Sequence, residues 1–338
     1  MERKDNQIYY RIDGGVLVVA QQFLKGMDIS FVNEIEEAGG KFYINETEYD
    51  VLEILKKSGV NSIRLRLWHT PSGGYNNLEK TLATAQRIKK HGFHFLLNFH
   101  YSDYWADPGK QTKPKAWESL TYPDLLKEVE AYTKEVISHF KKHDALPDMV
   151  QIGNEIISGM LWDDGRVTGE WDNQEQWEKL ASLVKSGITG LSQALDSDEE
   201  VKIMVHIDRG GDNQGSRKFF DKMEENKVIY DVIGLSYYPW WHGTMEDLTN
   251  NLNDLSERYQ KDIVLVEIAY PWTMSNNSNQ DFIVHSEEQL LPQYPATVDG
   301  QSQYLRDLIN IVRNTPNGKG MGVYYWEPCW IPFKKEWS

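Results

Sequence analysis

Two glutamates, Glu155 and Glu267, each end a short apolar stretch of the sequence. Paired carboxyl groups can cleave a glycosidic bond, because one protonates the leaving oxygen while the other attacks the anomeric carbon or activates water. A separation of about 5–5.5 Å between the two groups gives retention of anomeric configuration, and a wider separation gives inversion. We therefore predict that Glu155 and Glu267 are a catalytic pair for this chemistry.

The residues near these glutamates suit the same reaction. Asn154 directly precedes Glu155 and can hydrogen-bond a sugar 2-hydroxyl, a contact that strengthens in the transition state. We expect Arg66 to lie near Glu267, where it would orient that carboxylate and keep it ionised. Glu155 must instead hold its proton near the working pH, so we expect its pKa to be raised. An Asn-Glu pair is a weak signal alone and becomes strong beside a second glutamate that ends a later strand.

The elements that must position these residues follow a regular alternation. Continuous apolar runs, typical of strands covered on both faces, are separated by amphipathic segments of helical period. The predicted strands are Phe23–Ser30, Ser62–Trp68, Phe93–His100, Met149–Glu155, Lys202–Ile207, Val232–Pro239, Ile263–Tyr270 and Gly322–Glu327. The predicted helices are Glu48–Ser58, Leu78–His91, Asp124–His143, Gln174–Leu195, Ser216–Asn226, Met245–Tyr259 and Gln301–Arg313. This α/β rhythm predicts a (β/α)8 TIM barrel.

Nearly every predicted strand ends in polar or aromatic residues. The carboxyl ends of barrel strands form the active face, so these endings describe one pocket, although a polar barrel mouth without chemistry is the alternative. Strand register decides whether Tyr237 or Tyr238 points inward, and that choice stays open. Besides the two glutamates, the candidate substrate-binding residues at the strand ends are Arg66, His100, Asp103, Asn154, His206, Asp208, Tyr238 and Trp326.

The two ends of the chain depart from an ideal barrel. We expect residues 1–22 to form an N-terminal extension with a hairpin over Ile8–Val19 that turns at residues 13–15, and residues 23–338 to form a single catalytic domain. The extension either plugs the bottom of the barrel or is a remnant of a preceding domain. No eighth helix is predicted after the last strand, which indicates a shortened natural barrel or a truncated chain.

The composition limits the class of ligand. The 338 residues include 36 basic and 51 acidic side chains, and the net charge of −15 disfavours nucleic acid as a partner, because it repels a polyphosphate. Many of the 12 tryptophans and 18 tyrosines adjoin Asp, Asn, His or Gly, a pattern that suits the apolar face and hydroxyl rim of a sugar. The single cysteine, Cys329, rules out an internal disulfide and a cysteine-only metal site.

The sequence also bears on location. No stretch reaches the roughly 18 apolar residues that span a bilayer, so no membrane span is predicted. The first 25 residues lack the basic-then-apolar pattern of a secretion signal. Either the protein is cytoplasmic or a signal was removed before numbering began.

The motifs at the strand ends resemble those of glycoside hydrolase family 53, the endo-β-1,4-galactanases of glycoside hydrolase clan A. The resemblance runs from about Lys25 to Ile331, and its most specific parts are a Trp-Ala-Asp-Pro-Gly loop at residues 105–109 and a Tyr-Trp-Glu-Pro-x-Trp ending at residues 325–330. The matching segments are Gly59–Trp68, His100–Gln111, Gln151–Ile156, Lys202–His206, Gly234–Pro239, Val266–Glu267 and Tyr324–Pro328.

The resemblance implies a role for each matching residue. Glu155 would be the acid/base and Glu267 the nucleophile of a retaining reaction. Arg66, His100, Asn154, Tyr238 and Trp326 would support them, while sugar-stacking or cleft roles, or equally a role in stiffening long loops, fall to Trp105, Asp107, Trp240, Trp241 and Trp330.

The resemblance further implies that the substrate is the β-1,4-galactan of pectin side chains, cleaved by a monomer outside the cell. Two carboxyl groups suffice for this chemistry, so no cofactor is required. Some bacterial members of the family hold a structural calcium ion after the seventh strand. Residues 276–281 offer oxygen ligands there but do not match that site, so calcium is only a secondary option. The alternatives are a clan relative that acts on mannan, xylan or glucan, and a sugar-binding barrel without activity.

Overall fold

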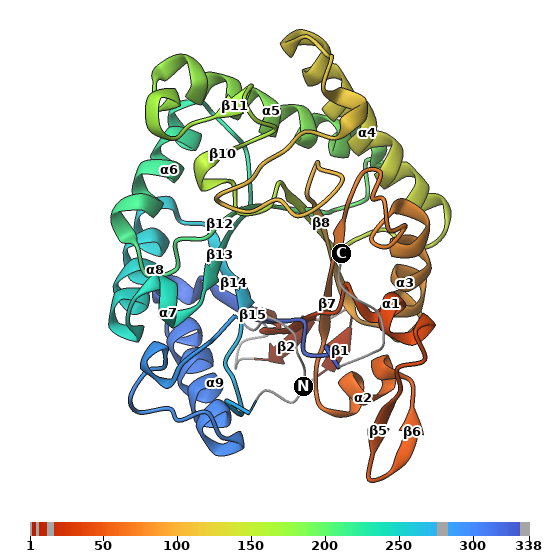
Figure 1. Cartoon of the computed structure of the whole chain (residues 1–338), viewed down its shortest axis with the longest axis vertical. Coiled ribbons are helices and arrows are strands. Elements are labelled where there is room, and N and C mark those ends of the chain that lie inside the picture. The colour runs from red at the N-terminus through yellow and green to blue at the C-terminus, as the bar shows by residue number, and fades with distance from the viewer. Residues whose placement is uncertain (1, 5–6, 12–16, 276–282, 332–338) are drawn as a thin grey trace.

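Eight parallel strands close into a barrel in the computed structural model, which describes residues 2–4, 7–11, 17–275 and 283–331. Figure 1 looks down this barrel, with the helices arranged around it. The strands are β4 (Leu24–Asp28), β7 (Ser62–Leu67), β8 (His94–Phe99), β9 (Met149–Ile152), β12 (Lys202–Ile207), β13 (Val232–Tyr237), β14 (Asp262–Ile268) and β15 (Gly320–Trp326). The predicted (β/α)8 barrel is confirmed.

All seven predicted helices lie in the connections between successive barrel strands. Most of them begin at a residue whose side chain accepts a hydrogen bond from the first turn, as Thr244 does for the backbone N–H of Asp247. Their apolar stripes face the barrel, and α4 buries Leu125, Val129 and Val136. The helices are α2 (Val51–Lys57), α3 (Leu78–Lys90), α4 (Tyr122–Lys142), α5 (Gln174–Ala194), α6 (Asn213–Glu225), α8 (Met245–Tyr259) and α9 (Val298–Arg313).

Several short elements in the loops were not predicted, because they are too short for a periodic pattern to register. They are the helices α1 (Val32–Glu37) and α7 (Pro239–His242), the two-stranded pairs β5 (Phe42–Ile44) with β6 (Thr47–Tyr49) and β10 (Gly159–Met160) with β11 (Gly165–Arg166), and the 3-10 turns η1 (Lys115–Trp117), η2 (Ile156–Ser158), η3 (Gly169–Trp171), η4 (Glu287–Gln289) and η5 (Pro316–Gly318). The described residues continue past β15 only to Ile331, so the predicted lack of an eighth helix concerns a region that lies mostly outside them.

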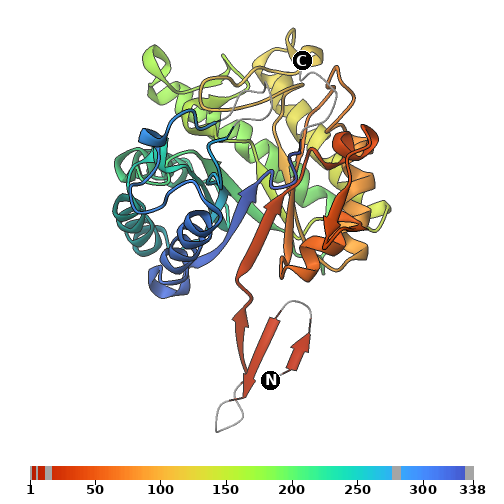
Figure 2. The ribbon, with the colours of Figure 1, turned by 60° about the horizontal axis from the view of Figure 1, so that its bottom comes forward.

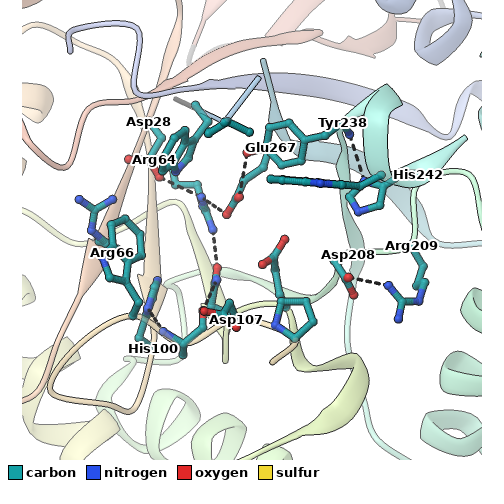
Figure 3. Close-up of a pocket in the computed structure, with 18 residues that line it drawn as sticks. Asp28, Arg64, Arg66, His100, Asp107, Asp208, Arg209, Tyr238, His242 and Glu267 are labelled. Carbon is teal, nitrogen blue, oxygen red and sulfur yellow. Dashed lines mark hydrogen bonds and ion pairs between the residues drawn. The ribbon is translucent and has the colours of Figure 1, made fainter. Parts of the chain in front are cut away.

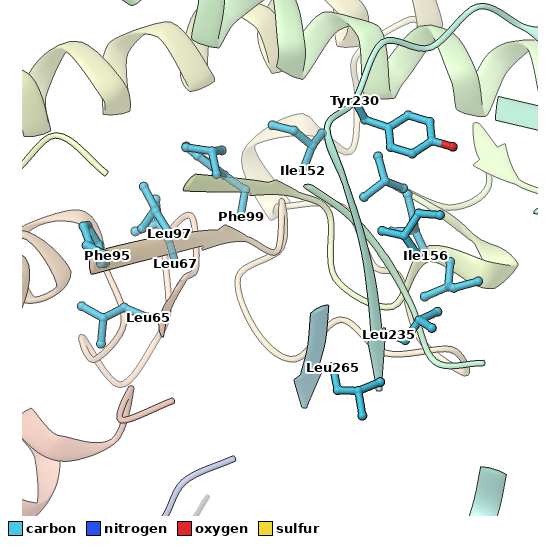
Figure 4. Close-up of a cluster of buried hydrophobic side chains, with 14 of the residues drawn as sticks. Leu65, Leu67, Phe95, Leu97, Phe99, Ile152, Ile156, Tyr230, Leu235 and Leu265 are labelled. Carbon is cyan, nitrogen blue, oxygen red and sulfur yellow. The ribbon is translucent and has the colours of Figure 1, made fainter. Parts of the chain in front are cut away.

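Strand alternation sends side chains in turn to the barrel interior and to the layer beneath the helices. On β7, Leu65 and Leu67 belong to the outer layer, which Figure 4 shows together with residues of the neighbouring strands. Arg64 and Arg66, which alternate with them, point into the barrel and are buried. A separate apolar cluster consists of Leu24, Leu96, Met149, Met204, Val232, Val264, Val266, Met321 and Tyr324, on the alternate positions of the strands.

A small antiparallel sheet precedes the barrel. It comprises β1 (Glu2–Lys4), β2 (Gln7–Arg11) and β3 (Leu17–Gln21), and β2 pairs with β3 from Gln7 opposite Gln21 to Arg11 opposite Leu17. Figure 2 shows this sheet projecting away from the barrel end at which β4 begins, rather than plugging it. The predicted turn at residues 13–15 lies outside the described residues, and the division of the chain at residue 22 stays a prediction. Within the described residues, no helix is long and apolar enough to cross a membrane.

Candidate active site

A cavity of about 460 Å³ opens at the carboxyl ends of the barrel strands (Figure 3). Charged side chains and tryptophans line it together, and this combination suits a sugar ring with its hydroxyl rim and apolar face. The lining residues are Asp28, Arg64, Arg66, His100, Trp105, Ala106, Asp107, Pro108, Asn154, Glu155, Asp208, Arg209, Tyr238, Trp241, His242, Glu267, Ile283 and Trp326.

Glu267 reaches this cavity through an irregularity of strand β14. The register between β13 and β14 pairs Leu235 with Leu265 but Ser236 with Glu267, so Val266 is an extra residue in β14. Leu265 belongs to the outer layer and Val266 to the inner cluster. A bulge of this kind re-aims the next side chain. It lets Glu267 follow Val266 into the interior, where regular alternation would have turned it toward the helices.

Two donors hold the Glu267 carboxylate. Arg64 Nη1 lies 2.8 Å from Glu267 Oε1, and Tyr238 donates its hydroxyl to Oε2 at 3.2 Å. Burial raises the pKa of Glu267 and the negative charge of Asp28 adds to that rise, while the Arg64 charge and both hydrogen bonds oppose it. Arg64 itself is almost fully buried and also donates to Asp28 Oδ2 at 2.9 Å. Arg64 and Tyr238 are therefore the neighbours that stabilise the carboxylate form of Glu267.

Glu155 enters the cavity through a turn at the end of β9. The strand ends at Ile152, Gly153 has a φ of 80°, and Glu155 has a φ of 48°, in the left-handed region that few residues other than glycine adopt. Such backbone geometry persists where the surrounding structure enforces it, commonly at functional sites. Here it turns the Glu155 side chain out of the strand direction and into the cavity.

The neighbours of Glu155 favour its protonated form. Burial raises the pKa of this carboxyl well above its ordinary value, and the negative charges of Glu267 and Asp208 raise it further. The hydrogen bond from Ser236 Oγ to Glu155 Oε1, 2.6 Å long, acts in the opposite direction. No basic side chain among the described residues forms an ion pair with Glu155, in contrast to Glu267. The two carboxyl groups therefore differ in the protonation state that their neighbours support.

Comparison with known proteins assigns the chain to a family. The sequence profile of glycosyl hydrolase family 53 matches residues 24–338. The chain belongs to this family. It is 57% identical over 320 residues to a protein from the bgaB 5′ region of Niallia circulans, covering 94% of this chain and 87% of that one. It is 34% identical over 322 residues to the endo-β-1,4-galactanase of Bacillus subtilis (strain 168), covering 92% and 71%. The family 53 catalytic domain of Ignisphaera aggregans superimposes with a TM-score of 0.87 at 38% identity, covering 96% and 89%.

In this family 53 chain, the expectation that Arg66 holds Glu267 is wrong. Arg64 makes that contact, and Arg66 Nη1 instead pairs with Glu327 Oε1 at 2.8 Å. Both arginines lie on the inner face of β7, but Arg66 lies two residues further toward the carboxyl end, level with the loop after β15. Arg66 still lines the cavity, and its guanidinium lies 4.3 Å from the centroid of the Trp105 ring.

Glu327, the partner of Arg66, is almost fully buried and does not line the cavity. Burial raises the pKa of Glu327 to about 8, although the Arg66 charge acts against this rise. In addition to Arg66, its carboxylate accepts a hydrogen bond from the backbone N–H of Phe31 at 3.4 Å. Two nitrogens of Arg66, Nε and Nη2, have no partner among the described residues. Both nitrogens are buried.

Asn154 occupies a fixed orientation in the cavity wall. Its Oδ1 accepts hydrogen bonds from Arg64 Nη2 at 2.8 Å and from Asn98 Nδ2 at 2.9 Å, while its Nδ2 donates to the backbone carbonyl of Ala106 at 2.8 Å. One N–H of the amide is thereby used, and the other remains for a ligand. This arrangement agrees with the predicted contact between Asn154 and a sugar hydroxyl.

One indole N–H and one backbone N–H hold His100 in a single tautomer. Its Nδ1 accepts from Trp68 Nε1 and from the backbone N–H of Ala106, both at 3.2 Å. Burial lowers the pKa of His100 well below its ordinary value, so the ring is neutral and carries its proton on Nε2. The cavity also brings together the predicted residues Trp105, Asp208, Tyr238 and Trp326.

Two predicted substrate-binding residues lie outside the cavity lining. Asp103 accepts hydrogen bonds from the backbone N–H groups of Thr70 and Lys115, at 2.8 and 2.9 Å, so it organises the loops after β7 and β8. His206 is fully buried one layer behind the cavity, where its Nε2 lies 2.9 Å from Ser236 Oγ. Both residues were predicted because they lie near the end of a strand. That criterion does not distinguish residues in the wall of a pocket from residues in the layer behind it.

The structure also resolves the choice between Tyr237 and Tyr238. Tyr238 points into the cavity and contacts Glu267, whereas Tyr237 belongs to the outer apolar layer and donates its hydroxyl to Gly243 O at 2.9 Å. Of the other aromatic residues expected at the cleft, Trp241 lines the cavity and is 60% exposed. Trp240 and Trp330 lie outside the lining, the latter packed edge-on against Trp326 at 4.9 Å between ring centroids.

Sequence reasoning missed several residues of the site. Arg64 could have been found, because it lies two residues before Arg66 and therefore on the same strand face. Asp28 at the end of β4 could have been found by the same search of strand ends. Ser236 and Gln151 carried no signal, because a serine or glutamine in an apolar strand is usually structural.

The predicted calcium option concerns the loop after the seventh barrel strand. Residues 276–281, the proposed source of oxygen ligands, lie outside the described residues. Within the described part of the chain, no group of three or more His, Cys, Asp or Glu side chains is placed to hold a metal ion. Calcium binding therefore stays a prediction.

Proposed function

We propose that this chain is an endo-acting, retaining galactanase that cleaves β-1,4-galactosidic bonds with Glu267 as nucleophile and Glu155 as acid/base. The observation that carries the proposal is the difference between the two glutamates that share the cavity. Arg64 and Tyr238 stabilise the carboxylate of Glu267, whereas burial and nearby negative charge favour the protonated form of Glu155. A double displacement needs this division between a nucleophile and an acid.

In the proposed first step, a Glu267 oxygen forms a bond to the anomeric carbon. The bond from that carbon to the leaving oxygen breaks, and this oxygen takes the Glu155 proton. The remaining N–H of Asn154 is positioned to donate to a hydroxyl of the same sugar. Such a contact strengthens as positive charge develops at the ring.

In the proposed second step, water replaces the departed sugar. Glu155, now ionised, takes a proton from this water as its oxygen bonds to the anomeric carbon and the bond to Glu267 breaks. Two inversions leave the product with its original β configuration. Tyr238 and Arg64 then receive the released carboxylate of Glu267. All of these side chains belong to one chain, so a monomer suffices for the reaction.

The choice of galactan is supported by the relatives. The Bacillus subtilis protein that is 34% identical to this chain is an endo-β-1,4-galactanase, and the chain spans 71% of its length. Galactan is a neutral polymer, which agrees with the net charge of −15 better than a polyanion does. We infer that the polymer is a side chain of pectin and that the enzyme meets it outside the cell.

Release of reducing sugar on four polysaccharides tests the substrate. We expect activity on β-1,4-galactan at least tenfold above that on mannan, xylan and carboxymethylcellulose. The Glu155→Gln and Glu267→Gln variants serve as matched controls, because they keep the shape of each side chain and remove its acid–base or nucleophilic function. Activity on mannan or xylan without activity on galactan would overturn the choice of substrate, and full activity of either variant would overturn the catalytic assignment.

A further inference from the structure

A chain of hydrogen bonds reaches Glu155 from behind the cavity. Gln151 Nε2 lies 3.0 Å from His206 Nδ1, His206 Nε2 lies 2.9 Å from Ser236 Oγ, and Ser236 Oγ lies 2.6 Å from Glu155 Oε1. Gln151, His206 and Ser236 are fully buried, and their side chains do not line the cavity. These three residues therefore act on Glu155 without touching a substrate.

The direction of each hydrogen bond follows from the partners. The Gln151 carbonyl oxygen accepts from Arg64 Nε and Nη2, at 3.2 and 3.1 Å, which turns its amide nitrogen toward His206. His206 Nδ1 faces this amide nitrogen and also the backbone N–H of Glu155 at 3.3 Å. Both neighbours are donors, so Nδ1 must be the unprotonated nitrogen of the ring.

The proton of the neutral His206 ring is consequently on Nε2, which donates to Ser236 Oγ. Ser236 Oγ then directs its own hydrogen to Glu155 Oε1. Burial and the Arg64 charge lower the pKa of His206 well below its ordinary value, so the ring stays neutral. The donors therefore run in one direction, from His206 through Ser236 to Glu155.

We propose that Ser236, fixed by His206, is a positioning residue that keeps Glu155 Oε1 an acceptor and so places the catalytic proton on Oε2. Oε1 already receives the Ser236 hydrogen, and a proton on the same atom would face that donor. Oε2 has no hydrogen-bond partner among the described residues and belongs to a side chain that lines the cavity. The inference rests on the proposed role of Glu155 as acid/base.

The same arrangement serves both steps of the reaction. In the first step, the proton on Oε2 moves to the leaving oxygen while the Ser236 hydrogen stays in place. In the second step, Oε2 takes a proton from the attacking water, and Oε1 is again the acceptor. Ser236 gains and loses no proton in either step. Its effect is to stabilise the ionised form and to fix which oxygen exchanges the proton.

Loss of the Ser236 donor has a definite effect on pH dependence. A donor to the carboxylate lowers the pKa of Glu155, so its removal raises that pKa. The acid must be protonated, so the alkaline limb of kcat/KM moves to higher pH. The other charged or titratable groups near Glu155 include Glu267, Asp208, Arg64, Tyr238, Asp107 and His206, of which only His206 loses a hydrogen-bond partner in this substitution.

Ser236→Ala tests the proposal on two substrates. We expect the alkaline limb of kcat/KM to move up by about half to one pH unit. We expect kcat/KM on galactan to fall by roughly 10- to 100-fold, because the proton is no longer directed to the leaving oxygen. On a 2,4-dinitrophenyl β-galactobioside, whose leaving group needs no proton, the loss is expected to stay below about threefold.

Three further variants control for structural effects. Ser236→Thr keeps the hydroxyl and is expected to restore both the limb and the rate. Ser236→Cys nearly keeps the side-chain volume but offers only a weak donor, so it is also expected to move the alkaline limb upward. It replaces Ser236→Ala as the test if the alanine variant does not fold. Ser62→Ala removes another buried serine hydroxyl of the barrel, one bonded to Tyr324, and is expected to leave the limb in place.

An unchanged alkaline limb in Ser236→Ala, with equal losses on both substrates, would overturn the positioning role. This failure is distinguishable from failure of the proposed function. If only the positioning role fails, the parent cleaves galactan and Glu155→Gln does not. If the proposed function fails, the parent is inactive on galactan or Glu155→Gln is fully active.

Discussion

Glu155 and Glu267 carry the same functional group, and their neighbours give them different chemistry. Glu267 lies beside a buried arginine and a tyrosine hydroxyl, whereas Glu155 lies beside a serine hydroxyl and two further carboxylates. Arg64 is on strand β7, Ser236 is on strand β13, and Tyr238 directly follows β13. At the scale of single residues, the account therefore depends on which side chain holds which carboxylate.

Arg64→Lys tests the partner of Glu267. Lysine keeps the positive charge but cannot match the planar guanidinium, which contacts Asp28, Glu267, Gln151 and Asn154 at once. We expect kcat/KM to fall by roughly 10²- to 10³-fold. The acidic limb of the pH profile is expected to move to higher pH, because Arg64 opposes the rise of the Glu267 pKa.

Arg66→Lys is the matched control, because Arg66 lies on the same face of β7 as Arg64 but pairs with Glu327. It is expected to leave the acidic limb in place. Thermal unfolding followed by circular dichroism verifies that both variants fold. If Arg66→Lys moved the acidic limb and Arg64→Lys did not, Arg66 would be the partner of Glu267.

Asp208→Asn tests the charge that acts on Glu155. Asp208 is mostly buried, its pKa is raised to about 6 by burial, and it is ionised above that pH. Its negative charge raises the pKa of Glu155, so the asparagine variant lowers that pKa. We expect the alkaline limb of kcat/KM to move to lower pH by roughly half to one pH unit.

Asp212→Asn is the control for this change. Asp212 also pairs with Arg209 but does not line the cavity, and an asparagine retains the hydrogen-bond acceptor that caps α6. Its pH profile is expected to match that of the parent. A limb that moves upward in Asp208→Asn would contradict the electrostatic account.

Many residues of the site could be predicted from the sequence, but the contacts between side chains on different strands could not. The rule that polar strand ends share one rim found Glu155, Glu267, Asn154, His100 and Asp208. It could not say which of two arginines on one face reaches a given carboxylate, because a difference of two residues along a strand amounts to about 6.6 Å of height.

At the scale of elements, two backbone irregularities aim the proposed catalytic pair. The bulge at Val266 brings Glu267 inward, and the left-handed conformations of Gly153 and Glu155 turn the chain at the end of β9. Neither follows from the alternation of apolar residues. The strands themselves were predictable, because each is a continuous apolar run, while a bulge leaves such a run unchanged.

Gly153→Ala tests the turn at β9. Gly153 has a φ of 80°, and an added Cβ would lie 2.7 Å from Ile156 Cγ2. We expect a loss of roughly 1–3 kcal/mol in the free energy of unfolding. Because the next residues carry Glu155, we also expect kcat to fall by about tenfold or more.

Gly39→Ala separates strain from displacement. Gly39 has a φ of 87° with nothing within 4 Å of an added Cβ, and it lies in the loop after α1, away from the cavity. It is expected to lose about 1 kcal/mol of stability and to keep the parent kcat. Denaturant unfolding and initial rates measure both quantities. Equal kcat values for the two glycine variants would show that the β9 turn does not aim Glu155.

At the scale of the whole molecule, a barrel with a strongly negative net charge presents a cavity lined by polar groups and tryptophans. The barrel was predictable, since eight apolar runs and seven amphipathic segments leave few other folds. The short helices α1 and α7 were not, because their four to six residues give no clear period. The distinction between cavity wall and supporting layer, as for His206, also required the three-dimensional structure.

The net charge of −15 leads to a prediction about salt. A neutral galactan feels little of this field, so we expect its kcat/KM to vary by less than about twofold between roughly 10 and 300 mM NaCl. Inhibition by polygalacturonate, a polyanion, is expected to strengthen as salt screens the repulsion. A tenfold fall of galactan activity with salt would indicate that charge attraction binds the substrate.

Trapping of the covalent intermediate tests the central claim most directly. A 2-deoxy-2-fluoro galactobioside with a good leaving group is incubated with the enzyme, and the labelled peptide is sequenced by mass spectrometry. The account predicts one label per chain, on Glu267. A label on Glu155, or cleavage of galactan with α-configured first products and no label, would contradict it.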